Sequence, residues 1–385
     1  MTPNTENVDV LICGAGPVGL YLGCALAETD LSFCILETNP APLPHSRSIG
    51  IHPPSVGLFD KIGLGDQLIS RGVRISKGVA HHDHGVLGTL DFNLLPPPHR
   101  YVLAVPQFET ETLLEARVEH RRRGSVRRGM RLTDFHTDGK MVHAYASGEN
   151  GDQHAFESKF LVGCDGKNSL VRELAGIGFH GKSYPDTYVM GDFPEHNAEK
   201  DRDTAHIHLH SHGLVESFPL PGGMRRWVIK TDSFAEKDPV DVLCRLASDR
   251  TGVTLKPETR TMISAFGVQR YLASAMVSRN IILAGDSGHI VSPIGGQGMN
   301  LGWMDAAELA DLLPQIVRGN LPVPELRQYS RNRLKAARTA IRRAEFNMTM
   351  GRNTRVPAIR NAFAKLMLKR PFNKLMAGLF TMRWL

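Results

Sequence analysis

The 385 residues include 42% hydrophobic and 22% charged side chains, which is typical of globular proteins and excludes collagen-like, coiled-coil and wholly disordered chains. This length predicts two or three compact units. The net charge of +7 is concentrated at one end: residues 346–385 hold eight basic and no acidic side chains, which leaves −1 for the first 345 residues. A nearly neutral body argues against a nucleic-acid partner, and we expect none.

Hydropathy and cysteine usage narrow the class further. No stretch approaches the roughly 18 apolar residues of a membrane span, and the polar start lacks the features of a secretory signal. We therefore expect a cytoplasmic protein. The five cysteines are odd in number and lie mostly in apolar runs, which predicts reduced, buried thiols and neither disulfides nor a zinc site.

The first informative stretch reads as a strand, a glycine-rich turn and a helix. An apolar run over 8–13 leads into Gly14, Gly16 and Gly19, and a helical pattern follows over 20–27. In this GxGxxG spacing the first glycine makes the turn and the second lets backbone N–H groups approach a pyrophosphate. The third lets the helix pack closely against the strand.

The residues around this turn support a nucleotide site. Pro17 suits a first helical turn, because its missing N–H costs little there. A second apolar run over 32–36 ends at Glu37, whose carboxylate can accept hydrogen bonds from a ribose. The whole segment therefore predicts a bound adenine dinucleotide.

Two later strand patterns share the form of the first. Apolar runs over 160–164 and 280–284 each lead into a short turn that contains an aspartate. Between them, residues 180–267 hold short strand patterns separated by turns, as expected of an antiparallel meander. From about residue 306 the pattern is helical, with breaks near the prolines.

Three motifs follow one another in a fixed order. The glycine turn with Glu37 is the first, the segment from Cys164 to Arg172 is the second, and the segment from Gly285 to Asn300 is the third. In this order and spacing they resemble the single-component FAD-dependent aromatic hydroxylases, typified by para-hydroxybenzoate hydroxylase, over about residues 8–345. The resemblance implies an α/β fold: a Rossmann-like FAD-binding domain with a parallel sheet, an inserted mixed β-sheet substrate domain and a helical C-terminus. We expect the discontinuous FAD-binding domain at 1–75, 100–179 and 268–345, the substrate domain at 76–99 and 180–267, and basic amphipathic helices at 346–385.

The resemblance also implies which residues hold FAD. Arg47 would offset the pyrophosphate charge, and Gln107 would hydrogen-bond toward the ribityl or phosphate region. Asp286 would accept from a ribityl hydroxyl, and a helix starting near Gly295 would point its N–H groups at the flavin. The implied cofactor set is Gly14, Gly16, Pro17, Val18, Gly19, Glu37, Arg47, Gln107, Asp165, Arg172, Gly285, Asp286, Pro293, Gly295, Gly298, Met299 and Asn300, with Asp165 and Arg172 also serving NAD(P)H.

The activity implied by the resemblance is that of a monooxygenase. NAD(P)H would reduce FAD, O2 would add to form a C4a-hydroperoxide, and one oxygen would pass to a phenolic or polycyclic aromatic substrate. The site must exclude water, and a base that favours the phenolate would help. Pro293 belongs to the implied catalytic set as well. The alternatives are an epoxidase or hydroxylase of a lipophilic quinone or polyene, and a prenyl-lipid reductase.

The segment 206–212 holds four histidines at alternate positions, so in a strand they share one face. They could be metal ligands, a pocket wall that supplies a base, or a solvated face with Ile207 and Leu209 pointing to the core. A spacing of roughly 6.6 Å between same-face residues, with no nearby Cys or acid, argues against a metal site, and we predict none. If the histidines form a pocket wall, His208 and His210 are the predicted catalytic residues. The nearby run from His81 to His84 is expected to be a surface loop.

The basic C-terminal segment is amphipathic. Ile359, Phe363 and Met367 share one helical face, whereas Arg360 and Lys365 lie elsewhere. Such a segment could cap the FAD-binding domain, form the interface of a homodimer, or lie on an anionic membrane as a peripheral contact. The sequence leaves these three interpretations open.

Overall fold

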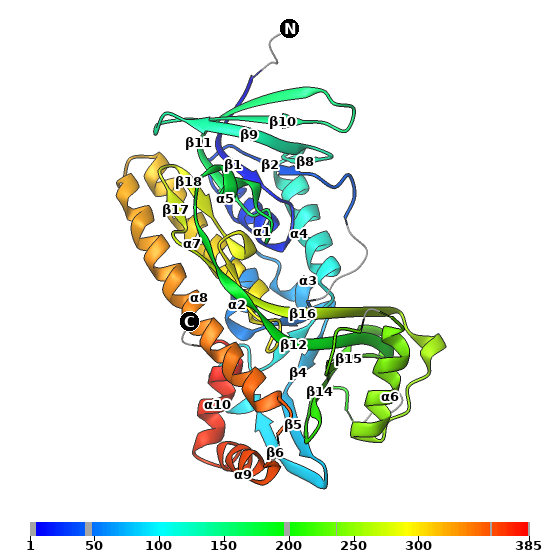
Figure 1. The fold of residues 1–385 in the computed structure, drawn as a ribbon. Coiled ribbons are helices and arrows are strands. Elements are labelled where there is room, and N and C mark those ends of the chain that lie inside the picture. The colour runs from blue at the N-terminus through cyan, green and yellow to red at the C-terminus, as the bar shows by residue number, and fades with distance from the viewer. Residues whose placement is uncertain (1–4, 43–47, 196–200, 236, 355, 384–385) are drawn as a thin grey trace.

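A computed structural model describes residues 5–42, 48–195, 201–235, 237–354 and 356–383. The predicted pyrophosphate residue Arg47 lies outside the described residues. The fold combines two large sheets with helices, and Figure 1 shows the strands of one sheet in the upper half of the molecule and most strands of the other below. The long strands β12 (Phe179–Pro194) and β16 (Met262–Ala273) of the second sheet extend toward the first.

The first sheet has the strand order β17-β18-β11-β1-β2-β8, and β10 and β9 extend it beside β11. The pairs of β1 with β11 and β2, of β2 with β8, and of β11 with β18 are all parallel, which confirms the predicted parallel sheet. The strands are β1 (Thr5–Cys13), β2 (Phe33–Glu37), β8 (Val126–Arg128), β9 (Arg131–Thr137), β10 (Val142–Ser147), β11 (Gln153–Gly163), β17 (Val277–Ser278) and β18 (Ile281–Leu283).

Three helices form the core with the first sheet. Helix α1 (Pro17–Leu26) packs against both α4 (Gln107–Arg121) and α7 (Gln297–Val317). The indole of Trp303 donates to the Pro17 carbonyl over 2.9 Å, so α7 is joined to the start of α1. Leucines and isoleucines of these elements form one buried apolar cluster, as their strand and helix periodicities require.

The second sheet has the order β19-β16-β12-β15-β14-β13-β5-β6. Its pairs are antiparallel except that of β13 with β5, which is parallel, so the sheet is mixed as expected. The remaining strands are β5 (Lys77–His82), β6 (Gly85–Asp91), β13 (Thr204–His210), β14 (Gly213–Leu220), β15 (Met224–Thr231) and β19 (His289–Ile290). The proposed domain limits stay a prediction.

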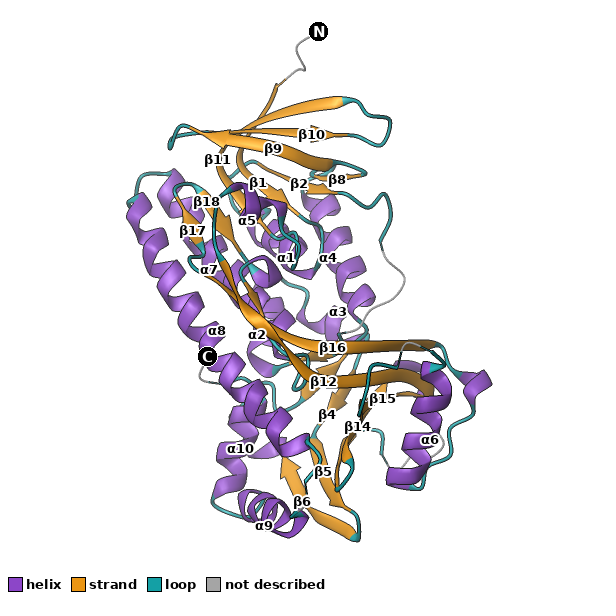
Figure 2. Cartoon of the chain, in the orientation of Figure 1, coloured by secondary structure: helices purple, strands orange, loops and turns teal. Residues whose placement is uncertain are grey.

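Short elements complete the chain between and beside the sheets, as Figure 2 shows by its colours. A small antiparallel sheet consists of β3 (Gly50–Ile51), β7 (Val102–Ala104) and β4 (Val73–Ile75). The other helices of this part are α2 (Pro53–Lys61), α3 (Gly65–Ser70), α5 (Leu170–Leu174) and α6 (Pro239–Thr251). Single 3-10 turns are η1 (Phe92–Leu94), η2 (Pro221–Gly223), η3 (Pro257–Thr259), η4 (Gly285–Ser287) and η5 (Val323–Glu325).

Three helices end the chain: α8 (Leu326–Gly351), α9 (Pro357–Met367) and α10 (Phe372–Phe380). The last two pack on β6, where the Asn373 amide donates to the Thr89 carbonyl over 2.7 Å. They therefore cover the second sheet, whereas Met382, just after α10, packs in a buried cluster with Leu301 of α7 and Ala337 of α8. The expected cap on the FAD-binding domain stays a prediction. No helix in the described ranges is both long and apolar enough to cross a membrane.

Candidate functional site

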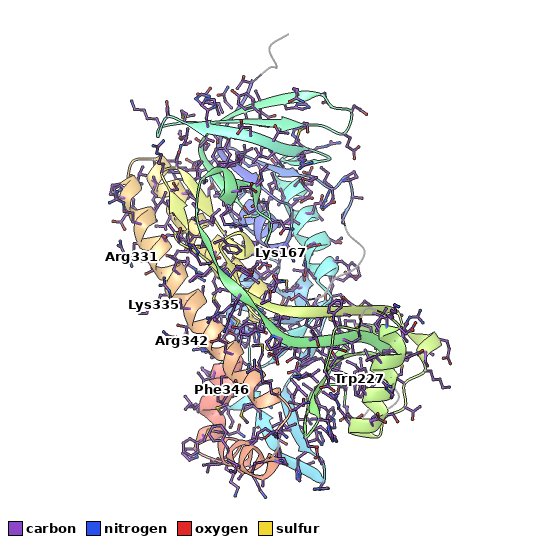
Figure 3. All side chains as sticks on the ribbon, viewed as in Figure 1. Lys167, Trp227, Arg331, Lys335, Arg342 and Phe346 are labelled. Carbon is purple, nitrogen blue, oxygen red and sulfur yellow. The ribbon has the colours of Figure 1, made fainter. Side chains whose placement is uncertain are left out.

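A cavity of about 1180 Å³ runs from the glycine turn after β1 to the helices α9 and α10. This volume exceeds the roughly 300–1,000 Å³ of an ordinary small-molecule site, so the cavity can hold a long cofactor together with a second ligand. In Figure 3, Lys167 lies beside the first sheet and Phe346 lies on the lower part of α8. Because Phe346 and the neighbours of Lys167 both line the cavity, it reaches from one sheet to the other.

The glycine turn forms one end of the cavity, and Gly14, Gly16, Pro17 and Val18 line it. Gly14 has a φ of +101°, and a Cβ there would lie 2.5 Å from the Cys164 carbonyl oxygen. A Cβ on Gly16 would meet no atom of the described residues within 4 Å. The backbone at the start of α1 is therefore open to close approach by an anionic group, which a helix N-terminus favours.

Two other predicted glycines serve packing instead of lining the cavity. A Cβ on Gly19 would lie 2.0 Å from the Gly14 carbonyl oxygen, so only glycine lets α1 pass this close to the turn. Gly285 has a φ of +69°, and a Cβ there would lie 3.0 Å from Val18. Gly19 therefore allows close packing within the first motif, and Gly285 allows close packing between the third motif and the first.

Glu37 lines the cavity with a carboxylate that is already oriented by the backbone. Its Oε2 accepts from the Ala15 N–H over 2.8 Å, and its Oε1 accepts from the backbone and side-chain N–H groups of Asn39 over 2.8 and 2.9 Å. A carboxylate has about four acceptor positions, so one or more remain for a ribose hydroxyl.

Two aspartates from the second and third motifs also line the cavity. No hydrogen bond to the Asp286 carboxylate is present within the described residues, and burial raises its pKa. Asp165 accepts from the Val171 N–H over 3.1 Å through one oxygen, whereas its other oxygen is buried with no partner in the described part. Burial raises the pKa of Asp165 as well. Polar atoms left unsatisfied in this way fit the hydroxyl groups of a ribityl chain.

The loop before α7 and the first turn of that helix bring four predicted residues to the cavity: Pro293 and Gly295 from the loop, and Gly298 and Met299 from the helix. Gly295 has a φ of +94°, which suits glycine, and the first turn of the 21-residue helix follows at once. Since a helix N-terminus carries partial positive charge, this end of the cavity stabilises negative charge on a ligand.

Two further predicted cofactor residues differ in whether they line the cavity: Gln107 does and Asn300 does not. Gln107 lines the cavity and donates to Glu111 over 2.8 Å. Asn300 lies behind the wall, where it accepts from the His52 N–H over 2.8 Å and donates to the Gly50 and Gly296 carbonyls. It holds the α7 loop in position.

Arg172 is not among the residues that line the cavity, and its contact with FAD or NAD(P)H stays a prediction. Its guanidinium donates to the carbonyls of Lys167 over 3.0 Å and of Ser287 over 2.9 Å. It also lies 3.8 Å from the ring centroid of Phe179. Arg172 therefore joins the second motif to the third.

Sequence analysis missed His52, which lines the cavity beside the α7 loop. Its Nε2 lies 3.1 Å from the Gly295 carbonyl oxygen, and its Nδ1 is buried with no partner among the described residues. Burial lowers its pKa to about 4, so the ring is neutral at pH 7. No motif contains His52, and only the fold brings it to this loop.

A buried network behind the third motif was missed too. Asp305 accepts from the Gly285 N–H over 2.9 Å and lies 2.6 Å from His289 Nε2 and 2.5 Å from Arg333 Nε. All three side chains are buried. Burial alone would raise the pKa of Asp305, but His289 and Arg333 outweigh it and the pKa is lowered. The network fixes the turn that presents Asp286.

The second sheet and the C-terminal helices form the other half of the cavity, which is mostly apolar. Its polar side chains are Glu216, Arg226 and Asn347. Arg226 forms a two-point pair with Asp192 at 2.6 and 2.7 Å. The apolar wall of this half includes Met190, Ile207, Leu209, Leu214, Phe218, Val228, Phe266, Phe346, Met350, Phe363, Met367, Leu368, Met376 and Phe380.

The predicted catalytic residues His208 and His210 do not line the cavity; their strand neighbours Ile207 and Leu209 do. Because side chains alternate along β13, the imidazoles lie on the opposite face of the sheet. There the His208 ring stacks on His81 at 4.3 Å between centroids, and burial lowers the pKa of His208 to about 3. The pocket-wall hypothesis is therefore wrong for these histidines. The surface loop expected over His81 to His84 is found only in its second half, since His81 and His82 belong to β5 whereas Asp83 and His84 form the turn before β6.

Comparison with known proteins gives one family. Residues 7–344 match the family model described as an FAD binding domain. The chain is 32% identical over 343 residues to 6-methylpretetramide 4-monooxygenase of Streptomyces rimosus, which covers 87% of this chain and 60% of that protein. It is 28% identical over 341 residues to pentachlorophenol 4-monooxygenase of Sphingobium chlorophenolicum, with 86% and 63% covered. The chain thus spans about 60% of the length of these curated relatives.

Solved structures have the same architecture. p-Nitrophenol 4-monooxygenase of Pseudomonas putida DLL-E4 superposes with a TM-score of 0.89 over 99% of this chain and 100% of that chain, at 22% identity. At this identity the match shows the fold alone. Anhydrotetracycline hydroxylase of Streptomyces rimosus matches with a TM-score of 0.79 at 28% identity, over 98% of this chain and 76% of that chain.

Proposed function

Because the chain belongs to the FAD binding domain family, we propose that it is an FAD-dependent monooxygenase that uses NAD(P)H and O2 to hydroxylate a phenolic or polycyclic aromatic compound. The observation that carries this proposal is one cavity that joins a dinucleotide cradle to an apolar chamber. The names of relatives that act on 6-methylpretetramide and pentachlorophenol support an aromatic substrate.

Each part of the cavity has a role in this proposal. Bound FAD supplies the electron transfer to O2. The backbone from Gly16 to Val18 would receive the pyrophosphate, Glu37 would hold the adenosine ribose and Asp286 would hold the ribityl chain. Asp165 lines the same cavity, and the N–H groups at the start of α7 would stabilise negative charge on the redox-active ring.

The apolar half of the cavity has two functions in this mechanism. Its side chains orient an aromatic ring by burying it, and they keep water from the reacting atoms. Helices α9 and α10 contribute five of these side chains, Phe363, Ala364, Met367, Met376 and Phe380, and Leu368 directly after α9 adds a sixth. The C-terminal helices therefore complete the substrate chamber.

The test is NAD(P)H oxidation by the FAD-loaded protein in air, with and without phenols, quinolones and quinones, followed by mass spectrometry of the products. We expect one of these compounds to stimulate oxidation severalfold and to gain one oxygen atom. If no compound stimulates oxidation and only hydrogen peroxide forms, hydroxylation of such aromatics is rejected. An anaerobic repeat with prenyl lipids then tests the alternative reductase, and quinone or polyene products test the alternative epoxidase.

We also propose a peripheral contact between the C-terminal helices and an anionic membrane. Ile359 is 72% exposed, and Leu366 and Leu375 are each 50% exposed, on the two helices that carry basic residues such as Lys365 and Lys374. Exposed apolar groups beside basic ones suit the surface of an anionic bilayer. A contact between two copies of the chain is the competing explanation of the same face.

Cosedimentation with vesicles of phosphatidylcholine and phosphatidylserine tests this contact. We expect the protein to sediment with them and the variant Ile359→Ser/Leu366→Ser to lose most of that binding. The control is Val323→Ser, because Val323 is also 50% exposed but lies before α8, outside the two C-terminal helices. Deletion of the helices is unsuitable because it would also open the chamber. Unchanged binding of the double variant contradicts the proposal, and a doubled mass in sedimentation velocity without vesicle binding indicates a dimer instead.

A further inference from the structure

Glu216 carries a carboxyl group between apolar neighbours on the second sheet. It lies on β14, where its direct partners across the sheet are Ile207 on β13 and Val228 on β15. All three side chains line the apolar half of the cavity. No described group donates a hydrogen bond to the Glu216 carboxylate, although the side chain is open to the cavity.

The charged and titratable groups near Glu216 do not compensate its charge. Arg226 on β15 is held by Asp192. Lys230, on the same strand, is buried with its Nζ 3.4 Å from the Thr231 carbonyl, and it does not line the cavity. On β12, the Tyr188 hydroxyl is buried without a hydrogen-bond partner among the described residues and does not line the cavity. Helices α8 and α9 face the chamber with apolar side chains and Asn347.

An unpaired carboxyl group in such a chamber is costly, because desolvation is not repaid by a hydrogen bond. Burial raises the pKa of Glu216 to about 7, so both of its protonation states are populated near neutral pH. A ligand that brings a hydrogen-bond donor to this wall would remove the cost. The ionised form then gains a charge-assisted hydrogen bond, which is roughly twice as strong as a neutral one.

We propose that Glu216 selects the substrate by accepting a hydrogen bond from a hydroxyl group on its aromatic ring. The inference rests on the proposed function and names the chemical class it would take: hydroxylated aromatics, in preference to their ethers. An ether oxygen carries no hydrogen to donate, so an ether in this position would leave the Glu216 carboxylate without a hydrogen bond. A site built around such a hydrogen bond rejects analogues that lack the donor.

The test is a titration of the FAD-loaded protein with 2-naphthol and with 2-methoxynaphthalene at pH 8, followed by the change in flavin absorbance or fluorescence. For the wild type we expect 2-naphthol to bind on the order of 10–100-fold more tightly than the ether. Glu216→Gln and Glu216→Leu should lose most of this preference without weakening the ether. Glu258→Gln, which removes an exposed carboxylate, is the matched control and should behave as the wild type.

The pH dependence of 2-naphthol binding is a second measurement, and it would not change with Glu216 if this residue only supported the fold. The carboxylate fraction of Glu216 increases as the pH rises through about 7, so 2-naphthol should bind more tightly at pH 8 than at pH 6, while its own hydroxyl stays protonated. Neither Glu216 variant should show this dependence. Melting temperatures verify that both variants fold, and Glu216→Gln should be at least as stable as the wild type at pH 8.

The outcomes separate this inference from the proposed function. If the hydroxyl preference is found and lost in the variants but no aromatic stimulates NAD(P)H oxidation, Glu216 is a binding residue and the monooxygenase proposal fails. If aromatics stimulate oxidation but the wild type titrates equally with both probes, or responds to neither, the inference is overturned. A preference that survives in both Glu216 variants overturns it as well.

Discussion

Gly14→Ala is expected to abolish FAD binding and to destabilise the protein even without the cofactor. A Cβ at this position would lie 2.5 Å from the Cys164 carbonyl oxygen, and the φ of +101° is one that side chains with a Cβ rarely adopt. Such backbone strain costs about 1–3 kcal/mol, and the clash with the backbone of Cys164, directly after β11, adds to it. Thermal unfolding of the apoprotein and titration with FAD measure the two effects.

Gly16→Ala is the matched control, because it differs only in what surrounds the new methyl group. Gly16 has a φ of −79°, and a Cβ there would have no neighbour within 4 Å in the part of the chain that the structure describes. We therefore expect an unchanged melting temperature of the apoprotein and weaker FAD binding, since the methyl group would enter the cavity. Wild-type stability of the Gly14 variant, or wild-type FAD affinity of both variants, would contradict this view of the turn.

The second large effect is expected for Asp305→Asn, which removes the central charge of the buried network. Arg333 and His289 both depend on this carboxylate, and Arg333 is only 7% exposed. Leaving one partner of a buried ion pair uncompensated costs about 3–5 kcal/mol. Because Asp305 also accepts from the Gly285 N–H, the turn that presents Asp286 should loosen and FAD affinity should fall.

Urea unfolding of the apoprotein and FAD titration test this expectation. Asp311→Asn is the control, since Asp311 is an exposed acid on the same helix, α7. It should change neither quantity. If Asp305→Asn unfolds at the urea concentration of the wild type, the network does not stabilise the fold, and if only FAD binding changes, its role is confined to the turn.

Local patterns predicted the elements of this fold well. The apolar runs that end at Cys13, Leu36 and Cys164 are strands of one parallel sheet, because a continuous apolar run of that length suits a strand buried on both faces. The glycine spacing after β1 predicted a turn whose geometry depends on neighbouring backbone, and most of the implied cofactor residues line one cavity. Arg47 lies outside the described residues and stays a prediction.

Site residues that belong to no sequence motif could not be predicted from local patterns. His52, Glu216 and Asp305 stand in segments that carry no recognisable spacing, and each reaches its partners only through contacts between elements far apart in the chain. The histidines of β13 show a second limit of prediction from local patterns. Alternation predicted that they share a face, but which face meets the cavity depends on the register of β13 with β14 and β5 and on what covers each side.

Glycine spacing and apolar periodicity predicted the dinucleotide turn, the strands beside it, antiparallel strands over 180–267 and the helical end, because both patterns are local consequences of backbone sterics and burial. The parallel pairing of the first sheet and the mixed pairing of the second were implied by the family resemblance. The tertiary structure was needed to show that α9 and α10 line the apolar half of the cavity, that Arg172 and Asn300 position loops, and that Glu216 faces the cavity with no hydrogen-bond donor among the described residues. The physical reason is that these properties belong to contacts between segments. How deeply a side chain is buried, and whether its charge is paired, depends on the residues that folding places next to it. No single segment encodes these neighbours.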